Sequence, residues 1–111
     1  MAGTFTISKR SNGEFQFNLK AGNGQIVLNS EGYSDKANCK NGIESVRKNS
    51  QDDKRFARET AANGKFYFNL TATNGQTIGT SQMYADESGR DAGIASVAEN
   101  APNADLLDET A

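Results

Sequence analysis

The sequence contains two similar segments in tandem, and this internal repeat constrains the fold more than any other feature. Residues 12–49 align without a gap on residues 63–100, at a constant offset of 51 residues. A stretch of about 50 residues buries too little apolar surface to be comfortably stable alone, so the two copies are expected to share one core. Identical pairs include Asn12/Asn63, Gly13/Gly64, Phe15/Phe66, Phe17/Phe68, Leu19/Leu70, Gly24/Gly75, Tyr33/Tyr84, Gly42/Gly93, Ile43/Ile94 and Val46/Val97.

The composition is that of a soluble globular protein. The 111 residues include 11 glycines, one proline and 23% charged residues, and no apolar run approaches membrane-spanning length. The first ten residues lack the apolar core of a secretory signal, and Cys39 stands alone, so no internal disulfide can form. We therefore expect a cytoplasmic protein that makes no membrane contact.

The net charge of the chain is slightly negative, which argues against a protein that binds double-stranded nucleic acid. The net charge is −2, but the segment after residue 100 holds three acids and no base, so residues 1–100 carry +1. A nearly neutral body lacks the basic footprint of nucleic-acid recognition.

Alternating apolar and polar residues predict two hairpins in each copy. In the first copy the alternation runs over residues 5–9 and 15–20, with an Asn-Gly turn on either side of the second run. If Val27 points inward, the second loop has three residues, 22–24, which places Leu19 opposite Val27 and requires a left-handed Gly24. The same parity predicts a three-residue loop over 11–13. In this register Asn18 and Ser30 share the outward face of the sheet.

One amphipathic helix follows the hairpins in each copy. Cys39, Gly42, Ile43 and Val46 lie at helical spacing after the capping sequence at Asp35. Mid-helix glycines at one repeat position, Gly42 and Gly93, indicate close packing of helix on sheet. We expect Asn49 and Asn100 to end the helices in the left-handed conformation.

The repeats extend over residues 5–49 and 56–100, with a solvated linker over 50–55. Residues 56–60 lie 51 positions after residues 5–9 and match that strand. A further step of 51 from Phe56 reaches Leu107 in the acidic tail 101–111. The tail is therefore either a short strand near 105–109 or a frayed end. We predict a single α+β domain. Its tandem β-β-β-α(-β) repeats form one antiparallel sheet with two helices on one face, related by a pseudo-two-fold axis.

The motifs N-G-x-F-x-F-N-L, N-G-Q, S-x-x-Y and G-I-x-S-V occur in this order in both copies. This pattern resembles the YegP-like family of small uncharacterised bacterial proteins. The resemblance implies β-β-β-α-β units in one sheet with the last strand of each unit exchanged onto its partner. On that basis Phe56 to Thr60 and the tail near Leu107 are the exchanged strands. Members with one repeat would pair as two chains; this chain is expected to be a monomer, with a homodimer as the alternative. No activity and no catalytic residue comes with the family.

The residues capable of chemistry are few. The chain has no histidine, which excludes a Ser-His or Cys-His nucleophile pair and removes the commonest metal ligand. Cys39 is expected to be an inert core thiol, and Asp35 and Asp86 to be helix caps. No catalytic residue, metal or cofactor is predicted.

The expected function is binding, with an unknown partner. A non-enzymatic binding or interaction module using the exposed polar face of the sheet is the first hypothesis. The alternative is binding of single-stranded nucleic acid through Tyr67 with Lys20, Lys65 and Arg58, which the acidic composition disfavours; a small enzyme ranks third. The candidate binding surface comprises Gln16, Asn18, Lys20, Ser30, Lys65, Tyr67, Asn69 and Ser81.

Overall fold

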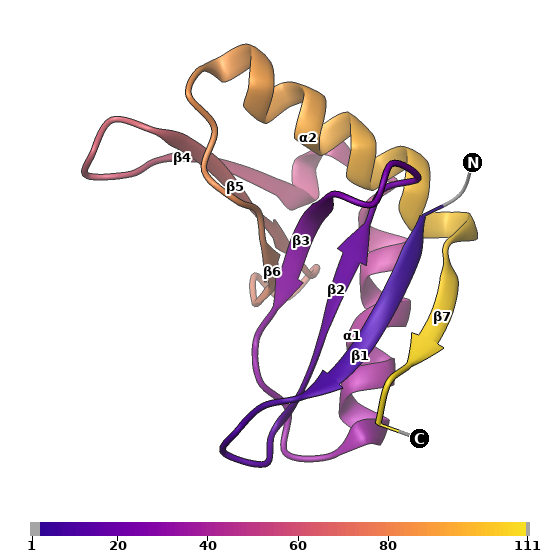
Figure 1. Ribbon diagram of the computed structural model, residues 1–111. Coiled ribbons are helices and arrows are strands. Elements are labelled where there is room, and N and C mark those ends of the chain that lie inside the picture. Colours follow the sequence, from indigo (N-terminus) through magenta and orange to yellow (C-terminus); the bar gives the residue numbers. More distant parts are fainter. Residues whose placement is uncertain (1–2, 111) are drawn as a thin grey trace.

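In a computed structural model that describes residues 3–110, the chain forms a single sheet covered by two helices (Figure 1). The strands are β1 Thr4–Lys9, β2 Phe15–Lys20, β3 Ile26–Ser30, β4 Phe56–Thr60, β5 Phe66–Thr71, β6 Thr77–Thr80 and β7 Asp105–Asp108. The helices are α1 Lys36–Asn49 and α2 Glu87–Asn100, and two short 3₁₀ turns, η1 Asp53–Arg55 and η2 Ala101–Asn103, precede β4 and β7. The predicted α+β class is confirmed.

The strand order, β4-β5-β6-β3-β2-β1-β7, reflects the repeat. Antiparallel pairing of β3 with β6 joins the two copies at the centre, so a pseudo-two-fold axis passes between these strands. The strand after each helix lies on the other copy, β4 on β5 and β7 on β1, as the resemblance implies. The expectation of a wholly antiparallel sheet is wrong in one place: β7 runs parallel to β1, because β1 already occupies the place beside β2 that corresponds to β4 beside β5, so β7 lies outside β1 in the same direction.

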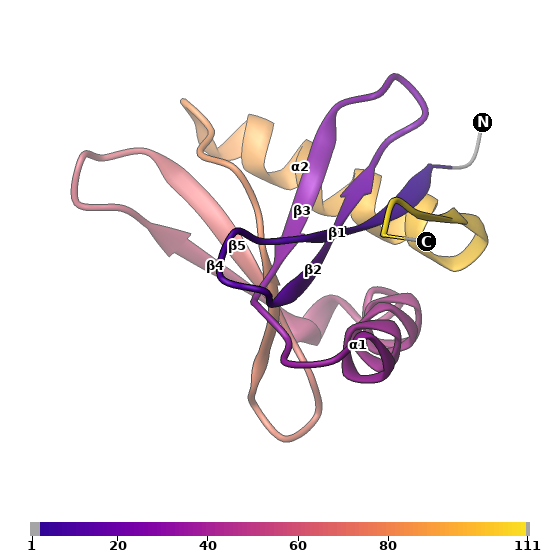
Figure 2. The same cartoon turned by 60° about the horizontal axis from the view of Figure 1, so that its bottom comes forward.

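Both helices lie on one face of the sheet, as predicted, and each spans the junction between the copies. Helix α1 contacts β2 and β6, and α2 contacts β5 and β3. Figure 1 shows β1 and β2 in front of α1, and both Figure 1 and Figure 2 show the β4–β5 hairpin projecting away from α1. The predicted caps are confirmed: Asp35 accepts a hydrogen bond from the Asn38 amide and Asp86 from the Gly89 amide, each at 2.7 Å.

The core lies between the sheet and the helices. A Cβ atom at Gly42 would overlap the Tyr33 hydroxyl, and the same holds for Gly93 and Tyr84, so the mid-helix glycines permit close packing. The Tyr33 ring stacks on Phe17 with centroids 6.2 Å apart. The largest fully buried side chains are Phe5, Ile7, Phe17, Leu19, Leu28, Cys39, Ile43, Val46, Phe68, Leu70 and Val97.

The turns have the predicted lengths, but the register of β3 differs from the prediction. Gly24 has φ +88°, and the Ala21 amide donates to the Gln25 carbonyl across a three-residue loop. Beyond this loop a bulge shifts the ladder, so Leu19 faces Leu28 rather than Val27, and Val27 and Leu28 are both buried. The predicted pairing of Leu19 with Val27 is therefore wrong, because one extra residue reverses the inward–outward parity that follows it.

The predicted helix ends are also wrong. Among residues 3–110 only glycines have positive φ, and the backbone continues in the right-handed conformation from Asn49 into Ser50. The Asn49 side-chain amide instead donates to the Ser45 carbonyl at 2.9 Å, and Asn100 does the same to Ser96. This bond back to the preceding turn occupies the side chain that was expected to support a left-handed end.

Candidate functional site

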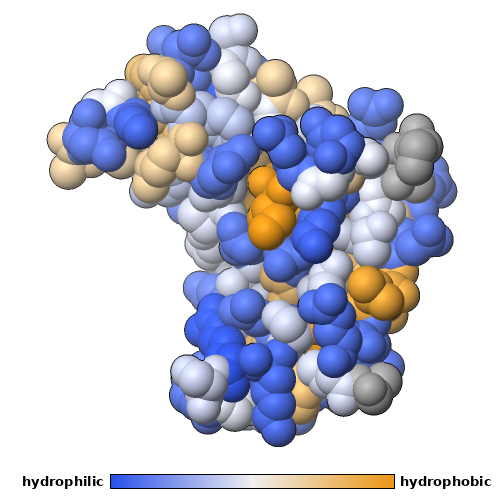
Figure 3. Space-filling view, viewed as in Figure 1, coloured by the Kyte–Doolittle hydropathy of each residue, from blue (hydrophilic) through white to orange (hydrophobic). Residues whose placement is uncertain are grey.

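The face of the sheet that points away from the helices holds part of the predicted binding surface. The side chains of Gln16, Asn18, Lys20, Tyr67 and Asn69 alternate with core residues along β2 and β5 and are half-buried. Lys65 is exposed in the turn before β5. Figure 3, drawn from the side of the strands, shows a mostly hydrophilic surface with small apolar patches.

Ser30 and Ser81 do not belong to this face. Ser30 pairs with Gly79 and Gly79 pairs with Leu70, whose side chain lies in the core, so the bulge before Ser30 places it on the helix side. Its hydroxyl accepts a hydrogen bond from the Phe17 amide and donates to the Glu31 carbonyl, both at 2.8 Å. Ser81 makes the equivalent bonds. Both hydroxyls therefore serve the backbone where the ladder ends, and the expected place of Ser30 beside Asn18 is corrected.

Several outward side chains already bond one another. Arg10 Nε donates to the side-chain oxygen Oε1 of Gln16 at 2.6 Å, and Gln16 Nε2 donates to the Ser8 hydroxyl at 3.3 Å. Thr80 donates to Asn69 Oδ1 at 2.8 Å. These groups have less capacity for a ligand than the sequence pattern suggests, because a bonded polar group must exchange one partner for another.

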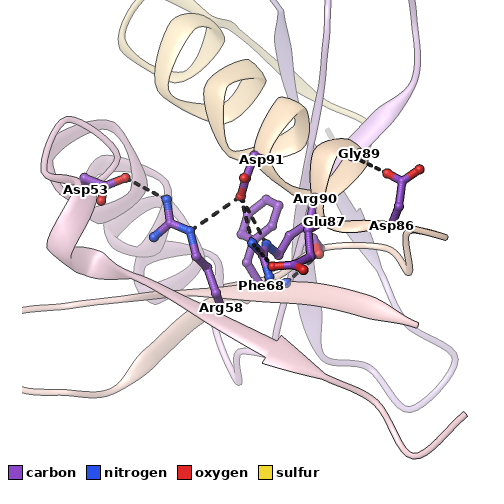
Figure 4. A network of polar contacts seen from close by, with 9 residues as sticks. Asp53, Arg58, Phe68, Asp86, Glu87, Gly89, Arg90 and Asp91 are labelled. Atoms are coloured by element: carbon purple, nitrogen blue, oxygen red, sulfur yellow. Dashed lines mark hydrogen bonds and ion pairs between the residues drawn. The ribbon is translucent and has the colours of Figure 1, made fainter. Parts of the chain in front are cut away.

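The structure does not assemble the predicted nucleic-acid surface. Tyr67 lies on the outward face opposite Glu59, a carboxylate that would repel phosphate. Arg58 pairs with Phe68 and therefore lies on the helix side, where its guanidinium contacts Asp53 at 3.0 Å and Asp91 at 3.5 Å (Figure 4). The predicted grouping of Arg58 with Tyr67 is wrong, because adjacent strand residues point to opposite faces.

A groove of about 650 Å³ lies between α1 and the β5–β6 turn, beside Tyr33. The groove joins the polar side of a helix from one copy to a turn of the other copy. Its charged group is Glu31, and its other polar side chains are neutral amides and hydroxyls: Tyr33, Ser34, Asn38, Asn41, Ser45, Gln76 and Thr77.

Part of the polar lining of the groove is specific to the first copy, although Tyr33, Ser45 and Gln76 have polar counterparts in Tyr84, Ser96 and Gln25. At the matching positions of the second copy, Asn38 becomes Gly89, Asn41 becomes Ala92, and Gly32 becomes Met83. On the strand side, Thr77 corresponds to Ile26. The second copy forms the same helix and strands without these polar groups, so the fold itself does not require them.

Tyr33 and Cys39, beside the groove, are neutral at physiological pH. Burial raises the pKa of the Tyr33 phenol, and the nearby Cys39 and Glu31 raise it further. Cys39 is fully buried, and burial together with the charge of Asp108 raises the pKa of its thiol to about 11. The prediction of a core thiol is confirmed, and Tyr33 presents a neutral hydroxyl.

Neither a metal centre nor a membrane span is found in the part of the chain that the structure describes. No three histidine, cysteine or carboxylate side chains within residues 3–110 lie close enough together to hold a metal ion. No described helix has the length and apolar character needed to cross a bilayer. Sequence reasoning missed the groove; the signal that could have found it is the change of Asn38 and Asn41 to Gly89 and Ala92 between the copies.

Two β-β-β-α units share one sheet and have a polar groove at their junction, so the chain is a tandem-repeat α+β protein. The chain belongs to the family described as Domain of unknown function (DUF1508), which matches residues 11–56 and 61–108, one match for each repeat.

The chain matches two relatives over nearly their whole length. The chain is 54% identical to the "UPF0339 protein in ptx operon 5'region" of Stutzerimonas stutzeri, over 97% of each chain. It is 52% identical to the "UPF0339 protein YegP" of Escherichia coli K12, over 99% of this chain and 100% of the relative.

Two solution NMR structures share the fold. That of yegP from E. coli, described as a protein of unknown function, has a TM-score of 0.93 at 51% identity and covers 98% of this chain and 94% of its own. That of a UPF0339 protein from Shewanella oneidensis has a TM-score of 0.91 at 52% identity, over 97% and 92% of the two chains.

Proposed function

We propose that the protein is a non-enzymatic binding module and that its site is the groove between α1 and the β5–β6 turn. The observation that carries this proposal is the divergence between the copies, because Asn38, Asn41 and Thr77 line the groove whereas their counterparts are Gly89, Ala92 and Ile26. These polar residues, which the second copy folds without, surround a groove. Recognition of a ligand is the function that accounts for them best.

The lining favours a neutral ligand rich in hydroxyl or amide groups, such as a sugar or a polar peptide. Each amide supplies both donors and an acceptor. Asn38 donates to its neighbour Asp35 at 3.2 Å, which leaves its carbonyl oxygen to accept from a ligand. Glu31 is exposed at the rim and supplies one negative charge, so an anionic ligand is disfavoured.

The absence of catalysis is part of the proposal and has separate support. The groove holds no histidine, and the neighbouring Cys39 thiol is buried with its pKa raised to about 11, so it supplies no thiolate nucleophile at neutral pH. The cytoplasmic location and the monomeric state expected from the sequence stay predictions, as does a single domain over residues 1–111.

Two alternatives have less support. Binding on the outward sheet face would use Gln16, Asn18, Lys20, Tyr67 and Asn69, of which Gln16 and Asn69 are already bonded to neighbours. Binding of single strands through Tyr67, Lys20 and Lys65 would place phosphate near Glu59.

The test is an NMR titration of the ¹⁵N-labelled protein with a panel of neutral sugars (glucose, N-acetylglucosamine, maltose) and the dipeptide Gly-Asn. We expect at least one of these to cause saturable shifts of amide signals at Asn38, Asn41 and Thr77. The shifts should be lost in an Asn38→Ala/Asn41→Ala variant and kept in Lys40→Ala, a matched exposed change on the same helix. No saturable shift with any of the four probes, or shifts that survive loss of both amides, would contradict the proposal.

A further inference from the structure

Glu31 is the charged side chain of the groove between α1 and the β5–β6 turn. Among residues 3–110, no other charged residue lines this groove. The amides and hydroxyls of the lining can recognise the uncharged part of a ligand. The carboxylate at the rim is left to recognise a charge.

The negative charge at this place belongs to the first copy. The counterpart of Glu31 is Gln82, which has a similar shape and no charge. The counterpart of the neighbouring Gly32 is Met83. The second copy thus forms the same connection between strand and helix without a carboxylate, so the fold does not account for the charge of Glu31.

The backbone is fixed on both sides of Glu31. The Ser30 hydroxyl donates to the Glu31 carbonyl and accepts from the Phe17 amide, both at 2.8 Å. On the other side, Tyr33 and Phe15 exchange two backbone hydrogen bonds of 2.7 Å. The carboxylate is therefore carried by a short segment between two anchored residues, which lowers the entropy lost when a ligand binds there.

Glu31 keeps its charge unpaired in the described part of the chain. No lysine or arginine within residues 3–110 forms an ion pair with it. Arg10 lies beside Gly32, where a Cβ atom would come within 2.9 Å of its Nη1. Its guanidinium already bonds Gln16 at 2.6 Å and lies 3.8 Å from Glu14, so this cation is balanced by an acid of its own.

Three cations of α1 lie on the side of the helix that faces away from the groove. Lys36 pairs with Asp108 of β7 at 2.9 Å, and the Arg47 guanidinium lies 5.0 Å from the centre of the Phe5 ring of β1. Lys40 is one turn after Lys36 and shares its side. Figure 1 shows β6 and β7 on opposite sides of α1, so these cations belong to the side away from β6.

The remaining walls of the groove add negative charge or none. Asp35 accepts from the backbone and side-chain amides of Asn38 at 2.7 and 3.2 Å, and it covers the positive end of the α1 dipole. The wall supplied by the second copy, residues 71–85, contains no charged residue. Lys48 is exposed in the last turn of α1 and does not line the groove. The charges nearest the lining are consequently those of two carboxylates, Glu31 and Asp35.

The charge of Glu31 is felt inside the groove. Burial and Cys39 are the larger causes that raise the pKa of the Tyr33 phenol, and Glu31 raises it further. The Tyr33 hydroxyl lies against Gly42, and both residues line the groove. A cation bound beside Tyr33 therefore lies within the field of the carboxylate that disfavours the ionised phenol.

We propose, on the basis of the proposed binding function, that the ligand of this groove carries a protonated primary amine and that Glu31 selects it. The ammonium group pairs with Glu31 at the rim, and hydroxyl or amide groups of the same molecule bind Asn38 and Asn41. An amino sugar and the amino end of a short polar peptide share this chemistry.

The first probe pair is glucosamine and glucose, which differ by an ammonium group in place of one hydroxyl. NMR titrations of the ¹⁵N-labelled protein at pH 6, where glucosamine is protonated, should show saturable shifts at Asn38, Asn41 and Thr77. Glucosamine should bind about threefold more tightly than glucose, the effect of one ion pair at an exposed site. The preference should shrink in about 0.5 M NaCl, because salt screens exposed charges.

A second probe pair distinguishes the two sources of the amine. The dipeptide amide Gly-Asn-NH₂ has a free amino group, and its acetylated form has none. A preference for the free amine in the peptide pair alone would assign the groove to peptides, and a preference in the sugar pair alone would assign it to amino sugars.

Variants at Glu31 test whether this residue is the source of the preference. Glu31→Gln introduces the residue that the second copy carries at the same place, so folding is expected. It should abolish the preference for the amine and leave the affinity for the neutral probes unchanged. The matched control is Glu44→Gln, an exposed acid of α1 that pairs with Arg47 at 3.1 Å, and it should keep the preference. Glu31→Lys should reverse the selection, so that glucuronate binds more tightly than glucosamine.

Failure of the inference can be told apart from failure of the binding function. Equal affinity within both probe pairs, or a preference that survives Glu31→Gln, would overturn the role of Glu31 and leave a groove that binds neutral ligands. Absence of saturable shifts with all four probes would overturn the binding function and the selection together.

Discussion

The side chain of Leu28 fills the space that Gly79 leaves open on the facing strand. A Cβ atom at Gly79 would lie 2.8 Å from Leu28 Cγ and 3.1 Å from the Asn29 carbonyl oxygen. The two residues hold the same position in the two copies and meet beside the pseudo-two-fold axis. One large side chain fits there and two do not, so the repeats have to differ at this point.

Exchanging these two residues tests the relationship. Gly79→Leu should destabilise the fold by about 1–3 kcal/mol through overpacking, and Leu28→Gly by about 2–5 kcal/mol through the cavity it leaves. The double variant, which moves the leucine to the other strand, should recover most of the loss, as measured by urea unfolding. Additive losses in the double variant would show that the side chains do not share one space.

A single substitution at Asn29 should stabilise the sheet. Asn18 Oδ1 is buried and has no hydrogen-bond partner within residues 3–110, whereas its counterpart Asn69 accepts from Thr80 at 2.8 Å. Asn29 is the counterpart of Thr80, so Asn29→Thr supplies the missing hydroxyl donor. We expect a gain of about 1 kcal/mol in the free energy of unfolding. Asn29→Val has a similar shape without the hydroxyl and should show no comparable gain; an equal gain would assign the effect to β propensity.

Acidification should loosen β7 before the rest of the sheet. Hydrogen bonds from Thr110, together with Lys36, lower the pKa of Asp108. A carboxyl whose pKa is lower in the folded than in the unfolded state stabilises the fold above its ordinary pKa of about 4, and this contribution is lost as the pH falls below that value. Amide exchange in β7, followed by NMR, should therefore accelerate relative to the central strands as the pH falls from 5 towards 2.

The matched variant for this effect is Asp108→Asn, which cannot titrate. Its β7 amides should exchange faster than those of the wild type at pH 6, and the ratio of β7 to central exchange should change little on acidification. The same steep pH dependence in this variant would assign the loosening to other carboxyls.

Cys39 should resist thiol reagents in the folded protein. Its side chain is fully buried, and its thiol pKa is raised to about 11. We expect labelling by a disulfide reagent at pH 8 to be limited by unfolding, and therefore to become fast only in denaturant. Rapid labelling without denaturant would place the thiol at an accessible site and contradict its position in the core.

Local signals in the sequence predicted much of this fold. The three-residue loop before Gln25 and the caps at Asp35 and Asp86 follow from the chemistry of a few adjacent residues, and the structure contains them as expected. The alignment of the two copies also predicted that both copies contribute strands to one sheet. These features can be predicted without knowing which distant segments contact one another in the fold.

The errors arise where contacts between the copies decide the structure. The bulge beside Leu28 brings this residue against Gly79, which lies 51 residues away, and no pattern within β3 reveals it. Because the bulge reverses parity, the wrong register placed Ser30 on the outward face. The groove was missed for the same reason, since it forms only when Asn38 and Gln76 come together from different copies.

The pairing of β7 with β1 ties the last described strand to the first. During synthesis on a ribosome, the nascent chain would leave the outer edge of β1 uncovered until Asp105–Asp108 emerge, because these residues follow the other described strands in the chain. Completion of the sheet then depends on a contact between residues about 100 positions apart, and such distant contacts form late. A chain that lacks Asp105–Asp108 should consequently expose an aggregation-prone edge on β1.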